Sequence, residues 1–259
     1  MKNFLFLLAG IVLFSCQSPS SETQQEDAVA IENPAAPGFN ANSDSEAIEI
    51  ADKVMAAMGG RKSWDETRFL FWNFFGARTL LWDKNSGDVR IEFLKEDKKI
   101  IVNEKTGEGK VWKNGQLEDN EDSIKFYLER GERIWINDSY WLVMPFKLKD
   151  SGVLLSYQGE DTTLTGEPCE KVRLTFQGVG VTPDNAYDVW VSKGDDLVKQ
   201  WAWFINATDS VPRFTRPWDN YQPMGSILLS DERGDRDLTE VKVLESVPEG
   251  IFESFDVSL

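Results

Sequence analysis

Alternating apolar and polar positions along most of the chain predict a mainly β protein with about eleven strands. Segments with apolar residues at every second position recur about every ten residues, and turn sequences separate them. Because no helical segments alternate with the strands, the sheet should be antiparallel. The predicted strands are residues 68–75, 79–83, 89–93, 98–103 and 110–113, followed by 153–158, 170–176, 186–191, 197–206, 226–232 and 239–246.

An amphipathic helix is predicted before the first strand. Ser43-Asp44-Ser45-Glu46 has the form of a capping box, and apolar residues then recur at helical spacing as far as Met58. The next two residues are both Gly, which ends the helix. Since only one face is apolar, the helix should lie against the sheet.

A second helical segment, residues 120–148, interrupts the strands. Its pattern predicts two or three short helical turns, with breaks near Gly131 and near Asn137-Asp138, and Pro145 closes the last turn. Each aromatic ring has roughly 150–250 Å² of surface, so the many rings here must cover something. We predict a helical lid over the concave face of the sheet. A helix packed permanently into an ordinary core is the alternative.

Aromatic residues are the candidates for lining a cavity beneath this lid. The chain has ten Trp and is 12% aromatic, which supports a large apolar core or cavity. The same side chains would also build a solid core, and where both faces of a strand are apolar the pattern does not decide which face points inward. The candidate ligand-binding residues are Phe71, Trp72, Trp82, Phe93, Trp112, Tyr140, Trp141, Met144, Trp201 and Trp203.

The first forty residues differ from the rest of the chain. Residues 1–15 combine a basic start with a short apolar run, which predicts a signal peptide too short to span a bilayer. Leu13-Phe14-Ser15-Cys16 is similar to the bacterial lipobox, so we expect lipidation at Cys16 and a stable membrane anchor. Residues 16–42 are polar and aperiodic and predict a flexible tether, and residues 43–259 form one folded domain.

Charge and composition argue against several classes of function. A net charge of −16 leaves no basic surface for a nucleic-acid partner. With no His, the chain cannot form a Ser-His-Asp triad or a His-ligated zinc site, and it has no phosphate-binding loop or dinucleotide fingerprint. Cys169 is expected to be a small buried residue. We therefore predict no enzymatic activity, no cofactor and no metal.

Two acidic turns have residues that could serve as chemical sites. Residues 83–88 are similar to a calcium loop, but Leu94 stands where the closing Glu would be, so a plain hairpin turn is predicted. Residues 231–237 could hold calcium or supply paired carboxylates to a hydrolase. Their mixed charges instead favour a solvated loop in which the charges pair locally.

The order of predicted elements resembles that of the lipoprotein-localisation factors LolA and LolB, and of an uncharacterised bacterial lipoprotein family associated with that fold. The resemblance covers roughly residues 44–259 and includes a closing Val-Pro-x-x-Ile-Phe segment. Particular stretches strengthen it: Gly59-Gly60 with Trp64, Leu81-Trp82-Asp83 with Gly87 and Arg90-Ile91, and residues 140–150.

This resemblance implies a curved, incomplete half-barrel whose apolar concavity holds acyl chains beneath helices. In LolA an arginine fastens the lid, and Arg78, Arg90 and Arg173 are all candidates for that role here. We expect a monomeric, lipid-anchored protein of the outer membrane, facing the periplasm, that carries or accepts a lipid or lipoprotein acyl chains. A scaffold that binds another envelope protein is the alternative, and a carboxylate-based hydrolase is the third.

Overall fold

The strands of the protein form two large antiparallel sheets and one small one. The computed structural model describes Met1 and residues 33–259, so the predicted signal peptide and Cys16 lie outside the described residues. Sheet A has the strand order β14-β1-β2-β3-β4-β5-β6, sheet B has the order β11-β10-β9-β8-β7, and β12 pairs with β13. The bounds in sheet A are β1 (Phe69–Phe74), β2 (Arg78–Asp83), β3 (Asp88–Phe93), β4 (Lys98–Asn103), β5 (Gly109–Lys113), β6 (Gln116–Leu117) and β14 (Leu238–Leu244). In sheet B they are β7 (Val153–Thr162), β8 (Pro168–Phe176), β9 (Ala186–Ser192), β10 (Val198–Phe204) and β11 (Phe214–Pro217).

The predicted fold class, an open and curved antiparallel β structure with helices, is confirmed. Three strands were missed, namely β6, β11 and β12 (Asp219–Met224), of which the last pairs with β13 (Ile227–Glu232). Strands β11 and β12 were not predicted because they contain Pro217 and Pro223, and proline argues against a central strand. Here β11 is an edge strand and β12 belongs to a two-stranded ribbon, where a missing N–H is tolerated.

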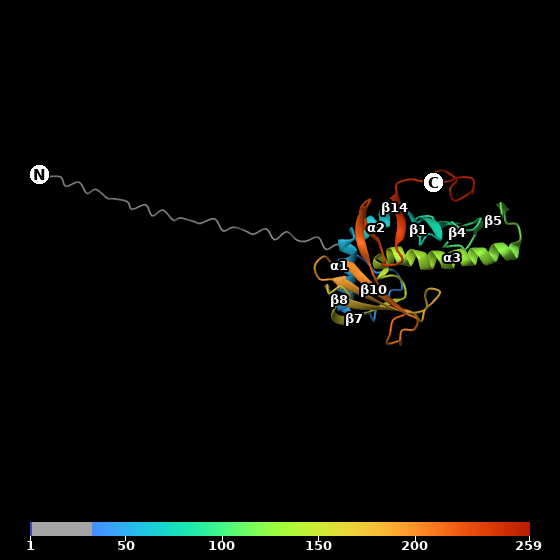
Figure 1. Ribbon diagram of the computed structural model, residues 1–259. Coiled ribbons are helices and arrows are strands. Elements are labelled where there is room, and N and C mark those ends of the chain that lie inside the picture. Colours follow the sequence, from blue (N-terminus) through green and yellow to red (C-terminus); the bar gives the residue numbers. More distant parts are fainter. Residues whose placement is uncertain (2–32) are drawn as a thin grey trace. The chain divides into compact units, whose positions relative to one another are not determined.

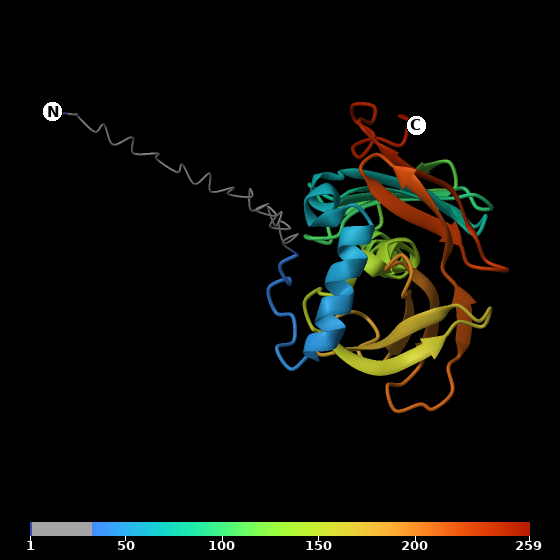
Figure 2. The ribbon, with the colours of Figure 1, turned by 90° about the vertical axis from the view of Figure 1, so that its left-hand side faces the viewer.

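Helix α3 (Glu121–Val143) lies between the two large sheets. Figure 2 looks along its axis, with sheet A above it and sheet B below it, and α1 (Ser45–Ala57) crosses one side of the space between them. Figure 1 shows α3 from the side, running beneath β4. The apolar residues of α1, of α3 and of the inner faces of both sheets join in one core. Within residues 33–259, no helix has the length and apolar composition that a bilayer crossing requires.

The predicted breaks in this helical segment are wrong, because α3 is one continuous helix of 23 residues. Gly131 allows a close approach to the sheet: a Cβ there would lie 3.0 Å from Ile100 Cγ2 and 3.3 Å from Val102 Cγ1. Asp138, the other predicted break, is buried inside the helix. Both residues therefore serve the packing of α3 against the rest of the fold, and neither breaks the helix. Pro145 was predicted to close the last turn, but it lies near the start of a further turn, the 3₁₀ helix η1 (Met144–Lys147).

The predicted capping box is also wrong, because its side chains bind a strand and do not cap the helix. Helix α1 starts at Ser45 and has no side-chain cap. Instead, Ser43 Oγ accepts from Leu155 N at 3.0 Å and Asp44 Oδ2 accepts from Tyr157 N at 2.8 Å. Both donors belong to β7, the edge strand of sheet B. Ser43 and Asp44 were predicted to cap the helix, but their side chains accept hydrogen bonds from the free edge of sheet B.

Packed structure begins before the predicted domain boundary. Asn33 donates through Nδ2 to Asp52 of α1 at 2.8 Å, and the backbone N–H of Ala36 donates to Lys149 O at 2.9 Å. The last ten residues of the predicted tether, 33–42, therefore lie against the domain. Two other predictions are confirmed: Cys169 is a buried free thiol, and Ile251 of the closing segment is buried. Burial raises the pKa of the Cys169 thiol to about 11.

We predict that Gly131→Leu destabilises the protein although leucine is the better helix former. The exchange should favour an isolated helix by about 1 kcal/mol. Overpacking against Ile100 and Val102 should lower the free energy of unfolding by about 1–3 kcal/mol overall. Urea denaturation measures the difference. Arg133→Leu, on the exposed side of the same helix, is the control and should change stability little; a Gly131→Leu protein as stable as this control would refute the close contact.

Candidate ligand-binding pocket

A pocket of about 490 Å³ lies between the C-terminal half of α3 and the inner face of sheet B. Its wall consists mainly of aromatic rings from one helix and four strands. These rings are Trp135, Tyr140 and Trp141 of α3, Phe176 of β8, Tyr187 of β9, Trp201 and Trp203 of β10, and Phe214 of β11. The residues at the end of β8 and in the loop to β9, Val179 to Thr182, complete the wall on one side.

The register of sheet B brings several of these rings to one face. Tyr187 lies opposite Trp203, and Trp203 lies opposite Phe214. Directly opposed residues of an antiparallel pair project from the same face, so the three rings form a row. Trp201 lies two positions from Trp203, on the same face, and stacks on Tyr187 with ring centroids 5.5 Å apart. The sheet thereby presents a continuous aromatic surface to α3.

Helix α3 meets this surface through Trp141. Its ring packs edge-on against Trp201 with centroids 4.9 Å apart and contacts Phe214 at 5.4 Å. On the other side, Trp135 of the same helix packs against Trp82 of sheet A at 5.3 Å. Aromatic contacts of this kind add about 0.5–1.5 kcal/mol to the burial of the rings. The helix is thus packed against both sheets, and the pocket is the space left on the side of sheet B.

Four of the ten predicted ligand-binding residues line this pocket: Tyr140, Trp141, Trp201 and Trp203. The structure places the other six elsewhere. Trp72, Trp82 and Met144 are buried in the core, Phe93 lies under Lys98, and Trp112 lies near Phe255. Phe71 faces the outer side of sheet A, where it borders a smaller cavity of about 210 Å³ with the C-terminal Leu259.

Four pocket rings were not among the candidates: Trp135, Phe176, Tyr187 and Phe214. Phe176 had a usable signal, because it continues the alternation of Val172 and Leu174 along its strand. Phe214 had none, since its strand was not predicted at all.

Arg78 of β2 fastens α3 by a buried ion pair with Asp138. Nε lies 2.6 Å from Oδ2 and Nη2 lies 2.7 Å from Oδ1, while the side chain of Asp138 is 0% exposed. Burial raises the pKa of Asp138, and the Arg78 guanidinium opposes that rise. The two other candidates act elsewhere: Arg90 donates to the carbonyl groups of Ile251 and Ser254, and Arg173 pairs with Asp188 within sheet B. Of the three, Arg78 is the one that binds α3.

Arg233 also holds α3, although no sequence pattern predicted this contact. The predicted solvated loop 231–237 is wrong at this position, because Arg233 is fully buried with its guanidinium 3.5 Å from the Trp218 ring centre. Its Nη2 donates to Trp141 O at 2.9 Å and to Ser230 O at 3.0 Å. Trp141 O is one of the last helical carbonyl groups, which have no partner within the helix and favour a nearby cation. Burial lowers the pKa of Arg233 to about 9.

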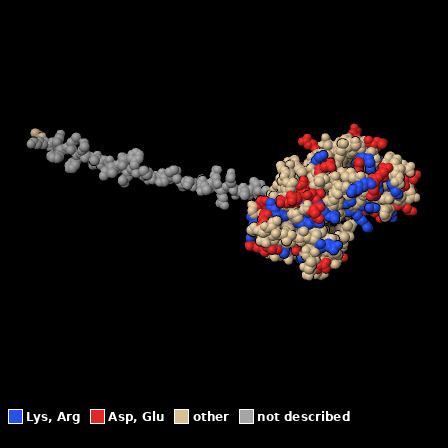
Figure 3. Space-filling view, in the orientation of Figure 1, with Lys and Arg blue, Asp and Glu red and all other residues tan. Residues whose placement is uncertain are grey.

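The three aspartates of this loop all have local partners, but only Asp235 forms an ion pair of the predicted kind. Asp235 pairs with Arg216, Asp237 Oδ1 accepts from the backbone N–H of Arg233 at 2.6 Å, and Asp231 accepts from Asn220 at 2.7 Å. On the face of the molecule shown in Figure 3, acidic and basic side chains are likewise interspersed. These carboxylates are engaged in structural contacts.

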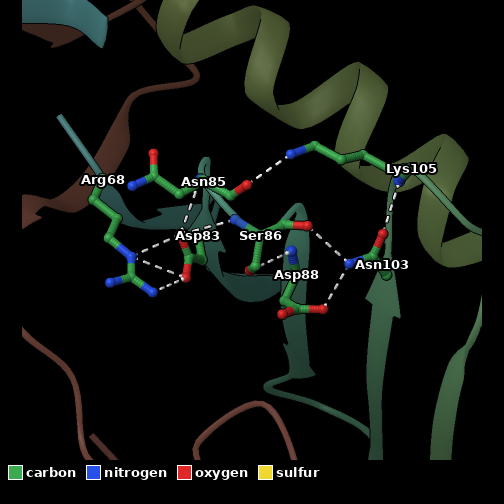
Figure 4. Close-up of polar contacts among 7 residues, drawn as sticks. All are labelled: Arg68, Asp83, Asn85, Ser86, Asp88, Asn103 and Lys105. Carbon is green, nitrogen blue, oxygen red and sulfur yellow. Dashed lines mark hydrogen bonds and ion pairs between the residues drawn. The ribbon is translucent and has the colours of Figure 1, made fainter. Parts of the chain in front are cut away.

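The acidic turn between β2 and β3 is a hairpin turn, as predicted. Asp83 is almost fully buried and accepts from Arg68 through both oxygens, at 3.0 and 2.8 Å, and from Asn85 N at 3.0 Å (Figure 4). Nearby, Asn103 Nδ2 donates to Asp88 at 2.9 Å and to Ser86 O at 3.0 Å. The oxygens that could have bound calcium hold the turn together. Among the described residues, no group of three or more His, Cys, Asp or Glu side chains could hold a metal ion.

Lys147 and Asp150 are the two charged residues among those that line the pocket, and they pair with each other. Nζ lies 2.5 Å from Oδ2, and both side chains are about one third exposed. Elsewhere in the wall, Asn185 can accept from Trp203 Nε1 and donate to Ile205 O, both at 2.9 Å. The hydroxyl of Tyr140 is buried and has no hydrogen-bond partner among the described residues; burial raises its pKa. The pocket is therefore mainly apolar, with one polar corner.

Comparisons with known proteins assign no family to the chain. No family model and no curated protein matches it. The solved structures that are similar to it include the following two. A DUF1329 family protein from Desulfovibrio piger is 12% identical, with a TM-score of 0.45, over 80% of this chain and 97% of that chain. A LolA superfamily protein from Nitrosomonas europaea is 10% identical, with a TM-score of 0.38, over 82% of this chain and 99% of that chain.

We predict that Arg78→Met costs about 3–5 kcal/mol at pH 7, because Asp138 then loses the partner of a buried charge. The pKa of Asp138, already raised by burial, should rise further in the variant. The folded variant then binds more protons than its unfolded chain above about pH 4, so its stability relative to the wild type should decrease as pH rises. Urea denaturation between pH 5 and pH 8 measures this. Arg78→Met with Asp138→Leu should recover most of the loss; equal losses in the single and double variants would refute the pairing.

We predict that Arg233→Met costs about 3–5 kcal/mol and loosens the end of α3. The exchange removes a buried charge and leaves the carbonyl groups of Trp141 and Ser230 without their donor. Hydrogen exchange of residues 140–148 should accelerate more than that of sheet A. Arg236→Met, an exposed position in the same loop, is the matched control. Uniform acceleration across the chain would show that Arg233 has no particular effect on α3.

Proposed function

We propose that this protein binds an apolar ligand, such as a lipid or acyl chains, in the pocket beside α3. The supporting observation is the aromatic cavity of about 490 Å³. Ligand sites of proteins commonly have 300–1,000 Å³ and apolar walls with a few polar groups, and this pocket has both properties. Every 100 Å² of apolar ligand surface that it covers would contribute about 2.5 kcal/mol to binding. The role we infer is that of a non-catalytic carrier or acceptor.

The proposed place of action is the bacterial cell envelope. Support comes from residues 1–16, whose sequence resembles a lipoprotein signal peptide in which Cys16 would be the acylated residue. Two or more acyl chains on Cys16 would anchor the protein stably, and we infer the outer membrane with the domain facing the periplasm. In that position the pocket could exchange its ligand with the same membrane.

We predict that the protein, purified without detergent, carries a lipid that native mass spectrometry detects. Val181→Trp should reduce this bound lipid by about tenfold, because the larger ring narrows the pocket at a residue that is half exposed and so tolerant of exchange. Val211→Trp is the matched control, since Val211 is also exposed, lies in the loop between β10 and β11, and does not line the pocket.

Two outcomes would contradict the proposal. The wild-type protein could hold no lipid and fail to bind the small apolar probe N-phenyl-1-naphthylamine. Alternatively, the two tryptophan variants could retain lipid equally.

A further inference from the structure

We infer that the ligand of this pocket is a lipid with one hydrocarbon chain and a zwitterionic headgroup. This inference rests on the proposed function and specifies its ligand class. Two observations carry it: the volume of the cavity, and the isolated pair of opposite charges in its wall.

The volume fits one chain. A cavity of about 150 Å³ holds one benzene, with six carbon atoms, so 490 Å³ has room for about twenty carbon atoms, which is close to one long acyl chain. A two-chain phospholipid or a three-chain lipoprotein anchor would need two or three times this space.

The cavity has no room to expand towards sheet A. Met144 and Trp72 are both 0% exposed and belong to the packed core. Expanding into such a core costs more than a chain gains, because interiors are close-packed. The second and third chains of a larger lipid would remain in water.

The polar corner fits a headgroup with both signs of charge. Lys147 Nζ and Asp150 Oδ2 lie 2.5 Å apart, and both side chains remain partly exposed. A carboxylate headgroup alone would be attracted by Lys147 and repelled by Asp150 at nearly the same distance. A headgroup with a phosphate and an ammonium group can pair with both residues and leave no charge without a partner. The net charge of −16 further disfavours a purely anionic ligand.

A lysophospholipid has both features, one hydrocarbon chain and a zwitterionic headgroup, whether it comes from the membrane itself or from outside the cell.

The test is competitive loading of the full chain carrying Cys16→Ser, which removes the predicted acylation site. The protein is incubated with phosphatidylcholine vesicles that contain equal amounts of palmitoyl lysophosphatidylethanolamine, palmitate and dipalmitoyl phosphatidylethanolamine. Bound lipid is then measured by mass spectrometry. We expect the lysophospholipid to exceed the two-chain lipid by at least about tenfold, and palmitate by a smaller factor.

Variants of the charged pair test the headgroup. Asp150→Asn should shift the preference towards palmitate, since Lys147 then stands alone, and Lys147→Gln should reduce binding of both single-chain lipids. Asp195→Asn is the matched control, because Asp195 pairs with Lys199 at 2.6 Å on a hairpin of sheet B that does not line the pocket.

The possible results distinguish a failure of this ligand assignment from a failure of the proposed function. Equal loading of the two-chain lipid would overturn the single-chain assignment. Preference for palmitate in the wild type, or an unchanged preference in Asp150→Asn, would overturn the zwitterionic headgroup. If N-phenyl-1-naphthylamine binds but none of the three lipids does, this inference fails while an apolar pocket stands. If the probe does not bind either, the proposed function itself fails.

Discussion

The position of α3 depends on two arginines, the partly buried Arg78 and the fully buried Arg233. Arg78 of β2 pairs with Asp138, and Arg233, which directly follows β13, donates to the carbonyl of Trp141, one helical turn further on. A buried ion pair adds little net stability, but breaking it leaves a charge without solvent or partner. Any other position of the helix that keeps these residues buried is therefore disfavoured, because it would leave a charge without a partner. The residues held in this way, 135–141, are the ones that wall the pocket.

The pocket lies on one side of α3 because the helix packs differently against its two sheets. Towards sheet A, Gly131 lets the backbone approach Ile100 and Val102, and the side chains there fill the interface. Towards sheet B, rings as large as Trp141 and Trp201 meet edge-on and hold helix and strands apart. Edge-on rings touch over a smaller area than interdigitated aliphatic side chains. The same helix therefore packs into a solid core with sheet A and leaves a pocket on the side of sheet B.

Sequence periodicity predicted the sheets well, because alternation records which face of a strand is buried. Residues 98–103 were predicted with the bounds of β4, and each end of the predicted first helix differs from that of α1 by one residue. The errors share a cause: Gly131, Asp138, Ser43 and Arg233 have local patterns typical of breaks, caps and loops, but tertiary partners decide their roles. Alternation likewise identified the aromatic residues, but it does not distinguish the face of Trp72, against a packed core, from that of Trp203, against a pocket.

These contacts bear on how a ligand could enter. Moving α3 away as a lid would break the Arg78–Asp138 pair, the Arg233–Trp141 hydrogen bond and the contacts of Trp141 with Trp201 and Phe214. The loop from β8 to β9 has no such cost. Its Val179 to Thr182 border the pocket, Val181 is half exposed, and a Cβ on Gly178 or Gly180 would meet no atom within 4 Å. Energetically, α3 is better described as a fixed wall, and the side of the pocket formed by this loop is the cheaper path for exchange.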